Sequence, residues 1–351
     1  MDGEELTEEE TALYDRQIRV WGVDAQKRLS KAHILVRGLN GTAVEFCKNM
    51  VLAGIGSLTL MDDRSVTEDV LQSNFLIPPD EAYYSGRSLD ELCCESLKDF
   101  NPMVRVSVEK GDLSQFDGEF FDKFDAVVLS CCSLKTKKAI NEKCRRRPRR
   151  VAFYAIECRD SCGEIFVDLQ KYTYIQVMSS YVAPCLDYIL DCYKHGCLDT
   201  SDASKKSDGT AECQLNYPSL EEAISIAWRD LPRKVSKVYF AMRVIERFEL
   251  SEGRNPGETS ISDLPLILKM RKELCDAQSL GESYIPTSLL ERILAAGGKE
   301  HPPVCAILGG VLGQEVIKAI SGKGDPLKNF FYFDTADGKG IIEDMSNSST
   351  S

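Results

Sequence analysis

The segment that follows the first predicted strand has the spacing of a nucleotide-binding loop. Such a loop needs one glycine for the turn, a second where the backbone approaches phosphate, and a glycine or alanine where helix meets strand. Gly38 and Ala43 provide the first and the last, but Asn40 stands at the middle position, where its side chain narrows the space for phosphate. The loop alone favours a structural turn, and we assign no cofactor-binding residue to this chain.

The cysteines and histidines are the next candidates for chemistry. There are fourteen cysteines and three histidines. Zinc sites need paired spacing such as C-x-x-C, whereas these cysteines occur as adjacent pairs or singly, and the histidines are far apart in sequence. An intracellular chain of this size keeps its thiols reduced. We therefore expect ordinary core or surface thiols and no metal site.

The elements around the loop alternate between strand and helix. Strands at 33–38 and 58–62 flank a helix at 42–53, and Asp62 closes the second strand about two dozen residues after Gly38. This βαβ unit is the plan of a dinucleotide-binding or ATP-binding fold. The pattern continues as helix, strand, strand, helix and strand at 87–100, 104–108, 125–130, after 133, and at 151–156. It predicts an α/β protein with a Rossmann-like, doubly wound parallel sheet and helices on both faces.

The second half of the chain departs from this alternation. Strand-rich sequence at 163–169 and 172–178 predicts antiparallel hairpin additions to the sheet, and the small polar residues of 200–212 predict a mobile loop. Helical periodicity then follows at 219–229, 233–249 and 261–277. We interpret these three segments as an inserted helical subdomain.

The chain finally returns to the first domain. The run 304–320 is apolar around nearly the whole helix and predicts a buried one, in which Gly309, Gly310 and Gly313 allow close packing. Two last strands are expected at 329–334 and 340–342. The predicted units are a helical arm, the first part of the Rossmann-like domain, a mostly helical insertion, the return of that domain and a disordered tail. Their bounds are 1–30, 31–178, 179–300, 301–345 and 346–351, respectively.

The N-terminal arm carries signals of its own. Thr7 and Glu10 have the capping-box spacing that begins a helix, and apolar residues recur at helical spacing from Tyr14 to Leu29. Gly22 is expected to divide this helix in two. The side chains of Asp15, Arg16 and Arg19 lie off the apolar stripe. They therefore point to solvent or to something that binds there.

Composition excludes several classes of protein. A net charge of -12 argues against nucleic acid as the main partner, because phosphate binding relies on clustered Lys and Arg. The acidic N-terminus lacks the features of a signal peptide, and no apolar run reaches the roughly 18 residues that a membrane helix needs. We expect an intracellular protein that binds neither nucleic acid nor membrane. The basic cluster 143–150 (KCRRRPRR) is open to two interpretations, a nuclear import signal or a solvated turn.

Four segments carry motifs beyond periodicity. They are 14–22 (YDRQIRVWG), 53–62 (AGIGSLTLMD), 101–104 (NPMV) and 303–310 (PVCAILGG). Together they closely resemble the subunits that activate ubiquitin and ubiquitin-like modifiers, and the match spans most of the chain apart from the loop near residue 205 and the tail. The resemblance implies an adenylation fold of the ThiF/MoeB type.

Features of the catalytic members of that family are missing here. Those members carry a full glycine loop, an Asn-Arg-Gln segment after the acidic loop, two zinc-binding C-x-x-C pairs, and a catalytic cysteine followed by threonine. Cys185 instead precedes Leu186, and Cys305 lies in a predicted buried helix, so we interpret both as ordinary buried thiols. The chain resembles an inactive half of the fold. Its length, the stretch 125–133 and its C-terminal helix look most like the small, regulatory subunit of the SUMO-activating enzyme.

The resemblance also implies a role for one residue. In this family the arginine of the N-terminal motif reaches across the dimer to the γ-phosphate of ATP held by the partner, a role that suits a guanidinium. Arg16 is therefore our one catalytic candidate. No cofactor is expected on this chain; ATP and Mg²⁺ are expected on the partner. Without the motif match, Arg16 would be interpreted as a solvated side chain pairing with Glu9 or Glu10.

The implied function is that of a non-catalytic regulatory subunit in an ATP-dependent SUMO-activating heterodimer. Its partners would be the catalytic large subunit and SUMO, and its location the nucleus, with a share in the cytoplasm. Three alternatives stay open: a regulatory subunit of the neddylation type, which carries a much longer insertion; a stand-alone nucleotide-dependent oxidoreductase, for which no His or Tyr-Lys constellation is evident; and a pure scaffold.

Overall fold

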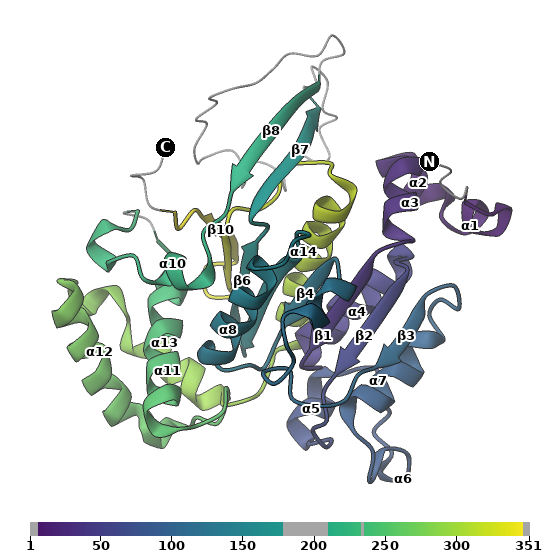
Figure 1. Ribbon diagram of the computed structural model, residues 1–351. Coiled ribbons are helices and arrows are strands. Elements are labelled where there is room, and N and C mark those ends of the chain that lie inside the picture. Colours follow the sequence, from purple (N-terminus) through teal and green to yellow (C-terminus); the bar gives the residue numbers. More distant parts are fainter. Residues whose placement is uncertain (1–5, 178–209, 233–234, 347–351) are drawn as a thin grey trace.

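The computed structural model describes residues 6–177, 210–232 and 235–346 and is shown in Figure 1. Its centre is an eight-stranded sheet of order β10-β9-β6-β5-β4-β1-β2-β3. Neighbouring strands from β3 to β5 run parallel, and the other three pair antiparallel. The order reverses at β1, as in doubly wound folds. The predicted α/β class is confirmed.

The bounds of the strands follow the predicted segments closely. The parallel strands are β1 (His33–Arg37), β2 (Ser57–Met61), β3 (Arg105–Val108), β4 (Ala126–Leu129) and β5 (Ala152–Arg159). The antiparallel strands are β6 (Cys162–Asp168), β9 (Phe330–Asp334) and β10 (Lys339–Glu343).

Alternate residues along the strands build a core on each face of the sheet. In β1, Ile34 and Val36 face one helical layer, Leu35 faces the other, and all three are fully buried. The first layer contains α4 (Gly41–Ala53), α7 (Leu89–Lys98) and α14 (Pro302–Ser321), and the second contains α8 (Leu134–Arg145) and α11 (Lys237–Glu252). Burial on both faces explains why these strands appear in the sequence as continuous apolar runs.

The predicted hairpin additions are only partly right. β6 joins the main sheet, but β7 (Lys171–Val177) pairs with β8 (Thr210–Asn216) in a separate two-stranded sheet that projects from the body (Figure 1). The predicted mobile loop 200–212 is therefore wrong for 210–212, which lie in β8; its other residues lie outside the described part of the chain. Pairing with β7 gives these polar residues backbone hydrogen bonds that their composition does not reveal.

Helices occupy most of the segment between β8 and α14. They are α10 (Leu220–Ile224), α11, α12 (Leu264–Gln278) and α13 (Thr287–Ala296), together with the 3-10 turns η2 (Trp228–Asp230), η3 (Ile261–Asp263) and η4 (Glu282–Tyr284). The three predicted helices are confirmed, although the first ends at Ile224, and α13 was not expected. Short elements elsewhere are α5 (Glu68–Ser73), α6 (Glu81–Tyr84) and η1 (Glu119–Lys123).

Helix α14 begins two residues before and ends one residue after the predicted run 304–320, and it corrects our expectation that no apolar run is long enough to cross a membrane. By length and composition alone it would suffice to cross a membrane, but 61% of its most apolar stretch is buried inside the protein, as in the core helix of a globular fold. It packs on α4, where a Cβ added to Gly309 would lie 2.6 Å from Glu45 Cβ. Of the predicted close-packing glycines, Gly309 is confirmed, Gly313 makes only ordinary contact, and Gly310 faces open space.

The N-terminal arm consists of α1 (Glu8–Leu13), α2 (Asp15–Trp21) and α3 (Val23–Leu29). Both bonds of the capping box are present, because Thr7 Oγ1 accepts from Glu10 N at 3.1 Å and the Glu10 carboxylate accepts from Thr7 N at 2.8 Å. Gly22, with φ of 86°, separates α2 from α3 as predicted. A further break at Tyr14 was not expected.

Candidate nucleotide crevice and an exposed arginine

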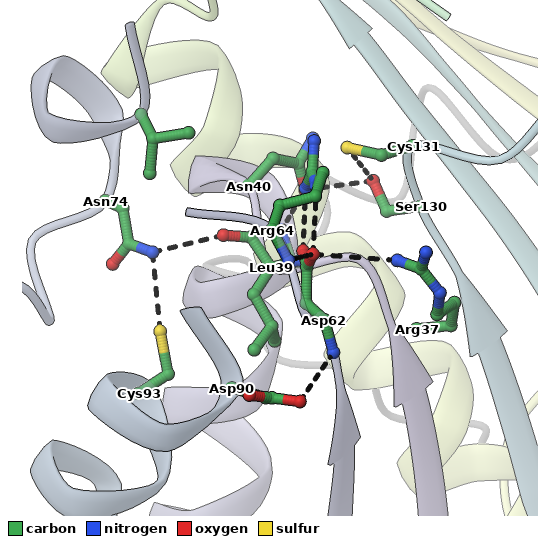
Figure 2. A network of polar contacts seen from close by, with 12 residues as sticks. Arg37, Leu39, Asn40, Asp62, Arg64, Asn74, Asp90, Cys93, Ser130 and Cys131 are labelled. Atoms are coloured by element: carbon green, nitrogen blue, oxygen red, sulfur yellow. Dashed lines mark hydrogen bonds and ion pairs between the residues drawn. The ribbon is translucent and has the colours of Figure 1, made fainter. Parts of the chain in front are cut away.

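The crevice expected for a nucleotide lies at the carboxyl ends of β1, β2 and β4. Figure 2 shows the side chains that meet there: they come from the end of β1 and the turn after it, from the segments after β2, α5 and β4, and from α7. Hydrogen bonds and ion pairs join them into one network.

Asp62, the acidic residue directly after β2, is fully engaged within the chain. Its Oδ2 accepts from Leu39 N at 2.7 Å and from Arg64 Nη2 at 2.6 Å, and its Oδ1 accepts from Arg64 Nε at 2.8 Å (Figure 2). Although burial opposes ionisation, these partners hold the pKa of Asp62 below its ordinary value. In nucleotide-binding relatives of this fold the equivalent acid binds ribose. Here Arg64 takes that place.

Asn40 has a structural task at the loop's middle position. As the N-cap of α4, its Oδ1 accepts from Ala43 N at 3.2 Å, and it also accepts from Ser130 Oγ at 2.9 Å. Its Nδ2 donates to Glu300 Oε1 at 2.5 Å. The structural-turn interpretation of the loop is therefore supported, with a side chain in the space where phosphate would lie.

Glu300 is the member of this site that we did not anticipate from the sequence. Its Oε1 also accepts from Thr42 Oγ1 at 2.8 Å, and its Oε2 lies 3.4 Å from both Thr42 N and Ser73 Oγ. Burial raises the pKa of Glu300 to about 7. The residue lies 260 positions from Asn40 along the chain. Neither the spacing of motifs nor the composition of the sequence predicts this contact.

Two cysteines lie next to Glu300. The Sγ atoms of Cys158 and Cys305 and a carboxylate oxygen of Glu300 all lie within 4.8 Å of one another, and the three residues are buried. This is the geometry of a group that could hold a metal ion, assembled from positions whose spacing gives no signal. The hydrogen bond with Cys305 and burial together raise the pKa of the Cys158 thiol well above its ordinary range. The Cys158 thiol is therefore protonated at neutral pH in the absence of a metal.

Arg16 lies on the outer side of the arm. Its side chain is exposed, and within the described ranges it forms no hydrogen bond or ion pair, with Glu9, Glu10 or any other residue. The neighbouring Arg19 behaves differently, since its Nη2 pairs with Asp15 Oδ2 at 2.9 Å. The guanidinium of Arg16 is therefore available to a binding partner.

Three of the sequence motifs meet to fix the arm on α4. The hydroxyl of Tyr14 accepts from Asn101 Nδ2 at 2.8 Å, and Asn101 also donates to Val51 O at 2.9 Å. Gly54, with φ of 76°, ends α4 beneath the Tyr14 ring, where an added Cβ would lie 2.3 Å from Tyr14 Cζ. Gln17 Nε2 donates to Leu52 O at 3.0 Å. These contacts satisfy the free carbonyls at the end of α4 and hold α2 firmly.

This anchoring places Arg16 far from the crevice of its own chain. The crevice lies at the amino end of α4 and the arm at its carboxyl end (Figure 1). The helix has 13 residues, a length of about 20 Å. An arginine side chain cannot span that distance, so Arg16 does not reach the crevice of its own chain.

Most basic side chains of the cluster 143–150 contact other parts of the chain. Lys143 Nζ donates to Ser114 O and Phe116 O, Arg145 pairs with Asp168 at 2.9 Å, and Arg149 pairs with Asp125 at 2.8 Å. These contacts favour the solvated-turn interpretation over that of a linear import signal. Of the two cysteines considered as nucleophiles, Cys305 is buried, and Cys185 lies outside the described residues.

Comparisons with known proteins agree with the resemblance of the motifs. The model of the ThiF family matches residues 14–349. SUMO-activating enzyme subunit 1A of Arabidopsis thaliana is 59% identical over 351 residues, covering 100% of both chains, and subunit 1B-1 of the same plant is 59% identical over 347 residues, covering 99% of both. SUMO-activating enzyme subunit 1 of Homo sapiens is 32% identical over 346 residues and 96% of both chains.

A solved structure supports the fold independently. The structure described as "Crystal Structure of SeMet PaaA" superposes with a TM-score of 0.54 at 13% identity and covers 98% of this chain and 76% of that chain. At this identity the likeness concerns the fold alone. The extent of the sequence matches decides the family: this chain belongs to the ThiF family, among the proteins of the SUMO-activating enzyme subunit 1 type.

Proposed function

We propose that this chain is the non-catalytic regulatory subunit of a heterodimeric, ATP-dependent SUMO-activating enzyme. One observation carries the proposal: the arginine of the N-terminal motif is exposed on a fixed arm, at the opposite end of α4 from a crevice filled by the chain's own side chains. The names of the full-length relatives support SUMO as the modifier. In this proposal the catalytic large subunit holds ATP and Mg²⁺, adenylates the C-terminal glycine of SUMO and takes it onto its own cysteine.

Arg16 would complete the adenylation site of that partner. Negative charge shifts along the triphosphate as pyrophosphate leaves. A guanidinium can stabilise this charge, because it is positively charged at neutral pH and presents several hydrogen-bond donors in one plane. Because α2 is fixed to the end of α4, the backbone that carries Arg16 needs little reorganisation on binding, which favours effective electrostatic stabilisation.

Exposed apolar side chains on the arm and on the neighbouring end of α4 support a docking role for the arm. Leu13, Val20, Val23 and Leu52 expose 56%, 81%, 45% and 44% of their surface, respectively. Val20 lies four residues after Arg16 on α2 and therefore shares its face. An apolar rim of this kind would be covered when the catalytic subunit binds.

The test is an ATP–pyrophosphate exchange assay in the assembled heterodimer. We expect Arg16→Ala to slow exchange by about 100-fold, the order of effect of one charged donor in a transition state, and Arg16→Lys to recover only part of the rate. Arg19→Ala is the matched control, because that side chain is already paired with Asp15. An unchanged rate in Arg16→Ala would leave the chain a scaffold, and robust exchange by the single chain would contradict the proposal altogether.

We further propose a nuclear location with a cytoplasmic share, as suits a component of sumoylation. Since the basic cluster is engaged in internal contacts, we expect entry to depend on the partner rather than on residues 143–150. A fluorescent fusion that carries Arg146→Ala, the most exposed member of the cluster, tests this. It should distribute like the unaltered chain, and its exclusion from the nucleus would restore the import-signal interpretation.

A further inference from the structure

The amino end of α4 has the build of an anion seat. In folds of this kind the backbone amides at the start of the first helix point at a phosphate, and the helix dipole favours the negative charge. Here the donors that converge on this point are Thr42 N, Thr42 Oγ1 and Asn40 Nδ2, joined by Ser73 Oγ from α5. An anion placed among them would be well bound.

The carboxylate of Glu300 already lies among these donors. It receives all four contacts, at 2.5 and 2.8 Å to Oε1 and at 3.4 Å twice to Oε2, and within the described part of the chain no cation pairs with it. The residue is 7% exposed. Its burial is tolerated because the helix end and the neutral donors replace the water that an exposed carboxylate would bind.

Backbone hydrogen bonds with Asp160 fix the position of Glu300. Asp160, in the left-handed region with φ of 49°, bridges to Glu300, donates its amide to Lys299 O at 3.0 Å and accepts from His301 N at 3.3 Å. Helix α14 begins directly after this segment. The backbone of Glu300 is therefore held on both sides, by the turn between β5 and β6 and by the start of α14.

We infer that Glu300 is a built-in occupant of the phosphate seat, and that this chain excludes nucleoside polyphosphates because its own carboxylate fills that seat. The inference rests on the proposed function, in which ATP is bound by the other subunit. It specifies how the crevice of this chain is kept free of nucleotide. It differs from the simpler explanation that Asn40 alone obstructs the loop. On that explanation, restoring glycine at position 40 would be enough to admit phosphate.

The experiment compares variants of the full chain by thermal unfolding with and without inorganic pyrophosphate. The unfolding temperature of Glu300→Ala should rise by about 3 °C at a pyrophosphate concentration tenfold above the Kd of this variant for pyrophosphate. The unaltered chain, Asn40→Gly and Glu300→Gln should gain nothing, because in each of them a side chain at position 300 still fills the seat. Glu315→Ala is the control for general effects of the anion, because it removes a different buried carboxylate, which lies on α14.

The outcomes decide the inference in either direction. A gain confined to Glu300→Ala supports it, whereas pyrophosphate binding by the unaltered chain, binding restored by Asn40→Gly alone, or no gain in Glu300→Ala overturns it. If Glu300→Ala does not fold, refolding yields of Glu300→Ser with and without pyrophosphate provide the same comparison. A metal ion that is present at one per chain in the unaltered protein and absent in Glu300→Gln would also overturn the inference. The carboxylate would then be a metal ligand together with Cys158 and Cys305. The assay contains no partner, so it fails or succeeds independently of the Arg16 test.

Discussion

At the scale of single residues, the buried carboxyl of Glu300 links folding to pH. Its pKa of about 7 in the folded chain, raised by burial from 4.5, means that the folded state holds this proton more tightly than the unfolded state. The contribution to stability is full below pH 4.5 and is lost as the pH rises through 7. It amounts to about 3 kcal/mol at most, at 1.36 kcal/mol per pKa unit.

Urea unfolding between pH 5 and pH 8 checks this. We expect the free energy of unfolding of Glu300→Gln to fall less over this range than that of the unaltered chain, because the amide does not titrate. Burial raises the pKa of Glu343 to about 7 as well, but Glu343 is present in both proteins and its effect cancels in the difference. Parallel curves for the two proteins would show that Glu300 does not titrate in this range.

At the scale of elements, the joint between α2 and α4 determines where Arg16 points. In Gly54→Ala the new Cβ would overlap the Tyr14 ring at a backbone φ of 76°. We expect a loss of about 1–3 kcal/mol in stability, faster proteolysis within the arm, and slower adenylation in the heterodimer.

A matched control separates the clash from backbone strain. Gly253 ends α11 with a φ of 64°, and an added Cβ there meets nothing within 4 Å. Gly253→Ala should therefore show only the backbone cost, about 1 kcal/mol, with normal adenylation. Equal effects of the two variants on adenylation would mean that the Tyr14 joint does not orient Arg16.

The same elements show which features of the fold a sequence can reveal. Local sequence patterns indicate strands that are buried on both faces and helices with a period of 3.6 residues. The elements β1, β2, α4 and α14 could therefore be predicted within a few residues. Strand β8 and helix α13 could not. The polar start of β8 gains its order from pairing with β7, and pairing over such a separation leaves no local pattern.

The candidate site divides in the same way. Asn40, Asp62 and Arg16 could be named because a loop motif, a strand end and an N-terminal motif mark them. The role of Glu300 and its grouping with Cys158 and Cys305 could not be predicted, because these contacts exist only after α14 returns to pack on α4. Long-range contacts of single polar residues are the part of a site that spacing cannot convey.

At the scale of the whole molecule, the exposed apolar rim of the arm predicts how the chain associates. Val20 exposes 81% of its surface, and covering a valine contributes about 1.5–3 kcal/mol. We expect Val20→Asn to weaken the heterodimer by about tenfold or more, where 1.4 kcal/mol corresponds to one factor of ten. The free chain should keep its unfolding temperature, because an exposed side chain contributes little to its core.

The control lies on the opposite part of the molecule. Leu250 of α11 is 61% exposed and belongs to the helical segment between β8 and α14, far along the chain from the arm. Leu250→Asn removes a similar exposed apolar side chain and should leave the dissociation constant of the heterodimer unchanged. The two constants can be compared by titrating labelled chain with the catalytic subunit. If both variants bind equally well, the partner does not cover the arm, and Arg16 would have no route to the ATP of the other subunit.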